Sequence, residues 1–252
     1  MLTNNQPKAI MIVIGNEVLS GRTKDKNIGW VAERLNSIGI NLIEARIIRD
    51  NREDIISTIQ DLSEKVDYIF TSGGIGPTHD DITTVAIAKA FRVPVEKNKE
   101  ALRRLEEHYK GTGIELNSAR LKMANIPQGA KLIDNPVSAA PGFKISNVYV
   151  MAGVPKIMQA MLDGILKTIK NGSKTISISI GCNIGEGNIA KGLEKIETSQ
   201  KNIEIGCYPW FRAGLAGTNV VIRSLDKQAC TEAAEKVKLL IREFGGDPQI
   251  IT

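Results

Sequence analysis

Aromatic residues, cysteines and histidines are scarce in this chain, and each shortage excludes a class of site. Aromatics make up 4% of the 252 residues, which is too few to predict stacking platforms for single-stranded nucleic acid. The three cysteines are widely spaced and form no CxxC pair, so neither a zinc site nor a disulfide framework is predicted. The two histidines, His79 and His108, belong to no Ser-His-Asp arrangement, so no hydrolase triad is predicted.

Long apolar runs and blocks of like charge are also missing. No apolar run approaches the roughly 20 residues of a membrane span, and the apolar stretch near the start lacks the basic flank of a signal peptide. The formal net charge is +5, and the excess of basic residues is spread over the whole chain. We therefore expect a cytoplasmic protein whose partners include no membrane and no nucleic acid.

The first part of the chain alternates between apolar runs typical of buried strands and apolar residues at helical spacing. This β-α-β-α-β-α order predicts an α/β fold in which helices cover both faces of a mainly parallel sheet, giving three layers, α/β/α. The predicted strands are 8–14, 40–48 and 67–71, and the predicted helices are 28–38, 52–63 and 82–91.

The rest of the chain completes this domain and adds a second. Another helix, short strand-like pieces, a strand and a long helix are predicted at 98–110, 126–147, 148–151 and 155–169, respectively. The sequence NGS at 171–173 marks a boundary, so we expect domains at 1–171 and 172–252. The second domain is predicted to be a small α+β unit, with strands at 175–180, 203–207 and 219–224 and helices at 186–196 and 227–244.

The most informative segment is TSGGIGPTHDDIT, from Thr71 to Thr83. It follows a predicted strand and opens a predicted helix, the position at which open α/β sheets bind ligands. Its glycines let the backbone approach a ligand closely, and N–H groups at a helix start favour an anion such as phosphate. Asp80 and Asp81 add two carboxylates, which indicates a divalent cation or a general base. The alternative is a glycine-rich turn whose aspartates cap the helix.

Further candidates follow other strands of the predicted sheet. Glu17 lies in GNEVLSG at 15–21, after the first strand, and could bind a ligand or, through water, a metal. Asp50 follows the second strand, and the small, rigid residues at 135–143 and 153–155 could form a ligand wall. The alternatives are a capped loop around Glu17, a helix cap at Asp50 and structural turns in the two later segments.

Together these segments resemble the molybdopterin-binding (MoCF) fold, and specifically the N-terminal part of the competence/damage-inducible protein A (CinA) family. The resemblance covers about residues 8–170, and residues 174–245 resemble the small KH-like domain that follows in CinA proteins. No counterpart of the C-terminal amidase domain of full-length relatives is present, so its activity is not carried over. The matching pieces are GNEVLSG at 15–21, Asp25, Asn27, TSGGIGPTHDDIT at 71–83, IPQGAKLIDNP at 126–136, APGF at 140–143 and GVP at 153–155.

This resemblance implies two functions. CinA-type relatives, and a similar domain fused to FAD synthases, hydrolyse pyrophosphate bonds in ADP-ribose or FAD with a divalent metal. Other relatives hold a pterin phosphate. We expect a metal-dependent nucleotide pyrophosphatase that forms homo-oligomers, as relatives commonly do. The alternative is a non-catalytic protein that binds molybdopterin or a nucleotide and is linked to molybdenum cofactor biosynthesis. Ser138-Ala139 departs from the usual Gly-Thr of the family, a change that could alter ligand contacts.

The predicted site follows from these segments and from the resemblance. Asp80, Asp81 and Asp50 are expected to be catalytic, and Mg²⁺, Mn²⁺ or Co²⁺ is expected on Asp80, Asp81 and Glu17. Contacts to a nucleotide or pterin ligand are expected from Gly15, Glu17, Gly21, Asn27, Thr71, Ser72, Gly73, Gly74, Gly76, Pro77, Thr78, Thr83, Asn135, Pro141 and Gly142. No nucleic acid is expected on the second domain, because its GXXG-spaced segment, Gly214 to Gly217, contains no basic residue.

Overall fold

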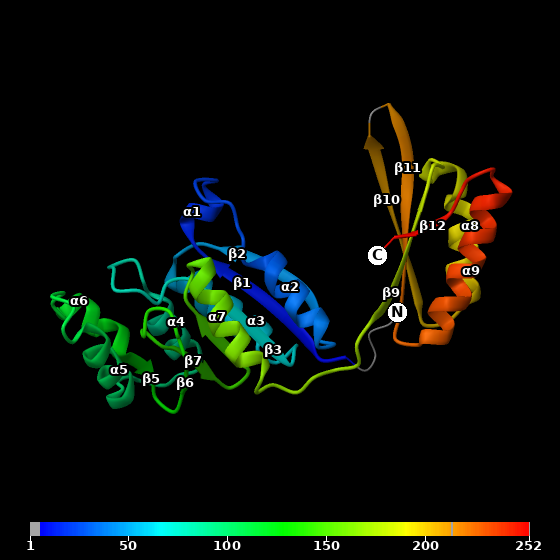
Figure 1. Cartoon of the computed structure of the whole chain (residues 1–252). Helices are drawn as coiled ribbons and strands as arrows, with labels where there is room; N and C mark the ends of the chain where they lie inside the picture. The colour runs from blue at the N-terminus through cyan, green and yellow to red at the C-terminus, as the bar shows by residue number, and fades with distance from the viewer. Residues whose placement is uncertain (1–5, 213, 252) are drawn as a thin grey trace. The chain divides into compact units, whose positions relative to one another are not determined.

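The computed structural model of the chain describes residues 6–212 and 214–251. The chain divides into two compact units, one formed by Pro7–Gly172 and the other by residue 6 with the described residues from Ser173 onward. Figure 1 shows the two units, and each is considered by itself below.

A six-stranded sheet forms the centre of the first unit, with the order β2-β1-β3-β8-β7-β6. The strands β2, β1, β3 and β8 are parallel to one another, whereas β7 and β6 extend the sheet in antiparallel fashion. The strands are β1 (Lys8–Ile14), β2 (Asn41–Ile48), β3 (Tyr68–Ser72), β6 (Lys131–Ile133), β7 (Gly142–Ile145) and β8 (Val148–Met151).

Helices bury both faces of this sheet. Central strand β1 is apolar from Ala9 to Ile14, because Ile10, Ile12 and Ile14 enter one core while the alternating residues Met11 and Val13 enter the other. The first core is covered by α3 (Arg52–Leu62) and α4 (Thr83–Ala90), and the second by α2 (Ile28–Ser37) and α7 (Pro155–Leu166). The predicted three-layer α/β/α fold with a mainly parallel sheet is therefore confirmed.

Residues 95–127 form a lobe that is inserted between α4 and β6. It contains the two-stranded antiparallel sheet β4-β5 together with helices, and Ala101, Leu105, Ala124 and Ile126 join it to the core under α3 and α4. Its elements are β4 (Val95–Lys97), α5 (Lys99–Tyr109), α6 (Ser118–Leu121), the 3-10 helix η1 (Lys122–Ala124) and β5 (Asn125–Pro127). The sequence analysis predicted α5 but not the β4-β5 pair.

The second unit is a four-stranded antiparallel sheet with the order β10-β11-β9-β12. Its helices α8 and α9 lie side by side against the sheet (Figure 1). The elements are β9 (Ile176–Cys182), α8 (Glu186–Ser199), β10 (Ile203–Arg212), β11 (Leu215–Ser224), α9 (Lys227–Glu243) and β12 (Gln249–Ile251). This confirms the predicted small α+β unit, although β10 and β11 are longer than predicted and β12 was not predicted.

Candidate functional site

A cavity of about 400 Å³ opens at the carboxyl ends of β1, β2, β3 and β8 in the first unit. Ligands bind at this edge in open α/β sheets. Its walls combine acidic side chains, a glycine-rich loop and an apolar rim. The lining residues are Ile14, Glu17, Asp50, Gly73, Gly74, Ile75, Gly76, Pro77, Thr78, Asp80, Asp81, Met123, Asn135, Ser138, Ala140, Ala152, Gly153, Val154 and Ile157.

Asp50 is a half-buried carboxylate of the cavity, and it is held by a backbone hydrogen bond. Its Oδ2 accepts the backbone N–H of Asn16, at 2.7 Å, from the short helix α1 (Asn16–Leu19). Burial raises the pKa of the Asp50 carboxyl above its ordinary value, and the neighbouring carboxylates of Glu17 and Asp80 raise it further. The hydrogen bond from Asn16 opposes this change. Carboxylates from three separate segments thus act on one another across the cavity.

The helix-cap alternative for Asp50 is excluded by its neighbour. Asn51 is the N-cap residue of α3, and its side-chain oxygen accepts the N–H groups of Glu53 and Asp54. Asp50 therefore lies outside the cap and directs its carboxylate to the Asn16 N–H instead.

The loop after β3 packs so tightly that two of its glycines cannot be replaced without movement. Gly73 and Gly74 have φ angles of +108° and +68°, a region that favours glycine. A Cβ on Gly73 would lie 2.1 Å from the carbonyl oxygen of Ile14, and a Cβ on Gly74 would lie 2.1 Å from Oγ1 of Thr83. These glycines are needed for the loop to fit against β1 and α4, which places the loop backbone at the cavity wall.

Three consecutive N–H groups of this loop are left free. The N–H groups of Gly74, Ile75 and Gly76 make no hydrogen bond to any residue within 6–212 or 214–251, although all three residues line the cavity. The N–H of Thr83, at the start of α4, is occupied by the carbonyl of Gly74 at 3.0 Å. Successive free N–H groups in such a turn form an anion-binding concavity, so the loop itself, more than the helix start, is suited to hold phosphate.

Thr78 connects the two aspartates at the end of the loop. Its hydroxyl lies within hydrogen-bonding distance of both Asp80 Oδ1 and Asp81 Oδ2, and its N–H donates to Asp81 Oδ2 at 2.7 Å. The Thr78 hydroxyl holds the pKa of the exposed Asp80 carboxyl below its ordinary value. Neither aspartate caps α4, whose first turn has no side-chain cap. The helix-cap alternative for this pair is therefore excluded.

Asn27 and Ser72 are buried residues that connect segments bordering the cavity. The Asn27 side chain is 4% exposed, and its Nδ2 donates to the carbonyl of Gly153 at 3.0 Å and lies 3.5 Å from Oγ of Ser72. Asp25 accepts the N–H groups of Asn27 and Ile28 and so fixes the start of α2. Asn27 thereby joins the end of β3 to the loop that follows β8.

Asn135 shapes another part of the cavity wall. Its Oδ1 accepts two backbone N–H groups, from Val137 and Ser138, and its Nδ2 donates to Oγ of Ser138 and to the carbonyl of Ala140, each at 2.8 Å. Asn135 is thus the centre of a tight turn, in which Ala139 adopts φ +58°. The turn presents Ser138 and Ala140 to the cavity.

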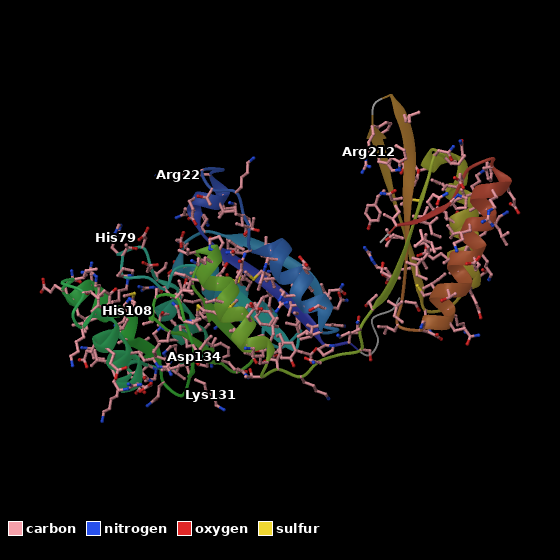
Figure 2. The ribbon with its side chains drawn as sticks, in the orientation of Figure 1. Arg22, His79, His108, Lys131, Asp134 and Arg212 are labelled. Atoms are coloured by element: carbon pink, nitrogen blue, oxygen red, sulfur yellow. The ribbon has the colours of Figure 1, made fainter. Side chains whose placement is uncertain are left out.

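The structure brings together ten of the residues that the sequence analysis selected. Glu17, Asp50, Gly73, Gly74, Gly76, Pro77, Thr78, Asp80, Asp81 and Asn135 all line the cavity. The other selected residues, Gly15, Gly21, Asn27, Thr71, Ser72, Thr83, Pro141 and Gly142, do not line it. Some of these are buried supports, as Asn27, Thr71, Ser72 and Thr83 show. His79 is exposed and is not a lining residue (Figure 2).

Several apolar lining residues, among them Met123 and Ile157, were not selected from the sequence. Met123 comes from η1 in the lobe and Ile157 from the first turn of α7. Their apolar character carries no functional signal by itself, since such residues usually belong to a core. Only the folded chain shows that they border the site.

The carboxylates do not form a complete metal cage. Within the part of the chain that the structure describes, no group of three or more His, Cys, Asp or Glu side chains is arranged to hold a metal ion. Mg²⁺, however, is commonly bound by one or two carboxylates together with substrate phosphates and water. The donor set at Glu17, Asp50, Asp80 and Asp81 fits a cation of this second kind.

No helix in the described residues is both long and apolar enough to span a membrane.

The family of the chain follows from its sequence matches. Residues 10–171 match the family described as "Probable molybdopterin binding domain", and the chain belongs to this family. Residues 174–244, in the second unit, match the family described as "FAD synthase, middle domain".

Individual relatives agree with this assignment. A protein of Metallosphaera sedula is 33% identical over 257 residues, which cover 94% of this chain and 96% of that protein. A "CinA-like protein" of Sulfurihydrogenibium sp. is 37% identical over 160 residues, but these cover 61% of this chain and only 40% of that protein. The segment matched in a Pyrobaculum calidifontis relative, at 35% identity, likewise spans 64% of the relative's length.

One solved structure is similar in both fold and sequence. It is the crystal structure of the protein CinA, of unknown function, from Thermoplasma acidophilum. The two chains are 33% identical with a TM-score of 0.60, and the match covers 65% of this chain and 98% of the other. The predicted resemblance to CinA proteins is confirmed.

Proposed function

We propose that the chain is a metal-dependent pyrophosphatase that hydrolyses a nucleotide diphosphate such as ADP-ribose or FAD. One observation carries this proposal. Gly74, Ile75 and Gly76, whose N–H groups are free, line the same cavity as Asp50 and Asp80. N–H groups suit an anionic substrate, whereas carboxylates suit a water molecule or a cation. A site that only stored phosphate would gain nothing from the carboxylates.

Three parts of the cavity would have separate roles in this reaction. The glycine loop holds the pyrophosphate through N–H groups that need no rearrangement when negative charge develops on the phosphate. Asp50 is the carboxylate best suited to accept a proton from the attacking water, because its raised pKa makes it the stronger base. The apolar rim of Met123, Val154 and Ile157 offers a surface for the ring of a nucleotide.

Asp80 and Asp81, with Glu17, would hold the divalent cation. When bound, such an ion neutralises phosphate charge and lowers the pKa of bound water. The Thr78 hydroxyl keeps Asp80 ionised and therefore available to a cation. Because the carboxylates alone form no cage, the substrate phosphates would supply further ligands. Affinity for the cation is therefore expected to rise when the nucleotide is present.

The second unit supports a link to nucleotides. It matches the family described as "FAD synthase, middle domain". The first unit is thus followed in the chain by a domain known from a protein of flavin nucleotide chemistry. The similarity to CinA-type proteins supports the same direction.

A second candidate function is binding of molybdopterin, or of a nucleotide, without turnover. The family description favours it, and so does the lack of a complete set of metal ligands among the described residues. In this case the glycine loop would hold the pterin phosphate, and the carboxylates would bind polar groups of the pterin ring.

A turnover screen separates the two candidates. ADP-ribose, FAD and related dinucleotides are incubated with the protein and Mg²⁺, Mn²⁺ or Co²⁺, and the mononucleotide products are separated by chromatography. The expected result is hydrolysis that a chelator abolishes and that Asp50→Asn reduces. The matched control is Asp163→Asn, which removes an exposed carboxylate on α7 that pairs with Arg34. Binding without any turnover under all three metals would favour the second candidate.

A further inference from the structure

Lys122 extends from η1 of the lobe to the end of the glycine loop. Its Nζ donates to the carbonyl oxygen of Thr78 at 2.6 Å, although the two residues are 44 positions apart in the chain. The side chain is half-buried. Thr78 and Met123, which follows Lys122, both line the cavity. The ammonium group is therefore held at the rim of the site.

The ammonium group of Lys122 is positively charged, whereas the charged residues that line the cavity are acidic. Four acidic residues line the cavity, Glu17, Asp50, Asp80 and Asp81, and no lysine or arginine among the described residues lines it. Lys122 lies close enough to Asp80 to make a small contribution to lowering the pKa of that carboxyl, after the larger effects of the Thr78 hydroxyl, the Asp80 backbone N–H and His79. Lys122 forms no ion pair with a described residue. Its positive charge is thus not neutralised by a close partner.

The ammonium group also has unused hydrogen-bonding capacity. A lysine Nζ carries three N–H donors, and the Thr78 carbonyl occupies one of them. An anion bound by the free N–H groups of Gly74, Ile75 and Gly76 would lie in a cavity whose other charged lining groups are negative. A diphosphate needs compensating positive charge there, and Lys122 is placed to supply it.

We propose that Lys122 is a phosphate-binding residue of this site. Its ammonium group, held at the rim by the Thr78 carbonyl, donates a hydrogen bond to an oxygen of the bound diphosphate. This inference rests on the proposed nucleotide ligand but not on turnover. It also gives the lobe a role in ligand binding, since the lobe contributes the cation while the sheet edge contributes the carboxylates.

The alternative is that Lys122 only ties the lobe to the loop. The two roles differ in their dependence on salt. A direct contact between ammonium and phosphate is screened as ionic strength rises, so loss of the contact should matter most at low salt. A purely mechanical tie between Lys122 and the loop would change affinity by the same factor at every salt concentration.

The test is the affinity of the 252-residue chain for ADP, measured by calorimetry with Mg²⁺ between roughly 20 and 500 mM salt, a range over which screening becomes strong. Lys122→Met is expected to weaken ADP binding by about tenfold or more at low salt, the scale of a hydrogen bond to a charged group. The difference should shrink as salt increases, and Lys122→Arg should stay within about threefold of wild type because it keeps a cationic donor. Lys131→Met is the matched control, since Lys131 lies on β6, well apart from His79 of the loop (Figure 2).

Lys122→Gln covers the case in which the Met variant is poorly folded, because Gln keeps a polar donor without the charge. It should show the same salt-dependent loss. Unchanged ADP affinity in either folded variant, or a loss independent of salt, would overturn the proposal. Wild-type binding of ADP without hydrolysis of any dinucleotide would remove the proposed activity and leave the role of Lys122 intact. A wild type that binds neither ADP nor inorganic pyrophosphate would overturn both.

Discussion

The backbone N–H of Asn16 donates to Oδ2 of Asp50 at 2.7 Å. This bond joins the segment after β1 to the segment after β2, and the backbone N–H of Asp50 itself also interacts favourably with the ionised carboxylate. Asp50 is therefore oriented by the backbone while remaining exposed to the cavity. Orientation through a main-chain donor is insensitive to the identity of the side chain at position 16.

Asp50→Asn should separate activity from stability. The amide oxygen of Asn can still accept the Asn16 N–H, so the fold is expected to persist. Removal of the carboxylate should reduce hydrolysis by roughly 10²-fold or more, the scale of one general acid–base group. Steady-state rates with ADP-ribose and Mn²⁺ measure this loss, and unchanged rates would show that Asp50 takes no part in the chemistry.

The same variant should alter the dependence of stability on pH in a defined direction. The pKa of Asp50 is raised in the folded chain. The contribution of Asp50 to the free energy of unfolding is therefore fully present below the pKa of the unfolded chain, and it is lost as pH rises through the pKa of the folded chain. At pH 7 the ionised, half-buried carboxylate lowers the unfolding free energy of the wild type, and Asp50→Asn removes this effect. We expect the melting temperature of Asp50→Asn to equal or exceed that of wild type at pH 7, with any advantage shrinking toward pH 4. An advantage that grows in acid would contradict this sign.

Gly74→Ala and Gly113→Ala form a matched pair. Both glycines have left-handed φ angles, +68° and +72°, but only the Cβ added at Gly74 meets another residue, Thr83, at 2.1 Å. Gly113→Ala should cost about 1–2 kcal/mol of unfolding free energy from backbone strain alone. Gly74→Ala should cost more and also weaken ADP binding, because the loop must move away from α4. Equal costs in urea unfolding would indicate that the contact at Thr83 relaxes freely.

Asp80 and Asp81 are expected to differ in their roles. Asp80→Asn should cut turnover by roughly 10²-fold and raise the metal concentration needed for activity, while ADP affinity holds or improves as repulsion falls. Asp81→Ala should weaken ADP binding as well, since Asp81 accepts the N–H and hydroxyl of Thr78 and so shapes the loop. Metal activation curves and calorimetry distinguish these outcomes. Identical profiles for the two variants would argue against separate roles.

The second unit is expected not to bind RNA strongly. Leu215–Gly217 of the GXXG-spaced segment lie in β11, paired with β10, and a KH module needs a free GXXG loop to clamp the nucleotide backbone. Fluorescence anisotropy with labelled single-stranded RNA at physiological salt should give a Kd weaker than about 1 µM, well above the range of specific complexes. Tighter binding by the full chain would contradict this expectation.

Self-association is expected through the exposed edge of the large sheet. β2 is an edge strand, and its Ile43 and Ile47 are 47% and 37% exposed. Edge strands with exposed apolar residues favour pairing between chains. Light scattering should give a mass well above the 27.4 kDa of one chain, and Ile43→Lys should lower it. A monomeric wild type at micromolar concentration would refute this prediction.

Much of the fold could be predicted because the central strands β1 and β8 are almost wholly apolar. KAIMIVI at 8–14 needs no long-range information to be identified as a buried strand. The β4-β5 pair and β12 could not be predicted, since each strand has three residues and depends on a distant partner. Three residues are too few to display a period of two.

The site could be predicted where its residues are contiguous in sequence, and not where folding selects among them. Residues 71–83 contain most of the loop that lines the cavity. Asp50 and Asn51 are adjacent and both can cap a helix, and only the folded backbone shows that Asn51 does so. Lys122 has no local signal at all, because its partner Thr78 is brought near by the packing of the lobe.

The lobe has a sheet of its own, distinct from the central sheet. This affects how ligand preference can diverge among relatives. The acidic groups belong to segments at the sheet edge, while Met123 and Lys122 belong to an insertion that has its own small sheet. Substitutions that accumulate within 95–127 would change which molecule is accepted without displacing the carboxylates. Homologues with similar acidic residues but unlike lobes would then have distinct ligands, and exchange of this insertion between two homologues would transfer ligand preference from one to the other.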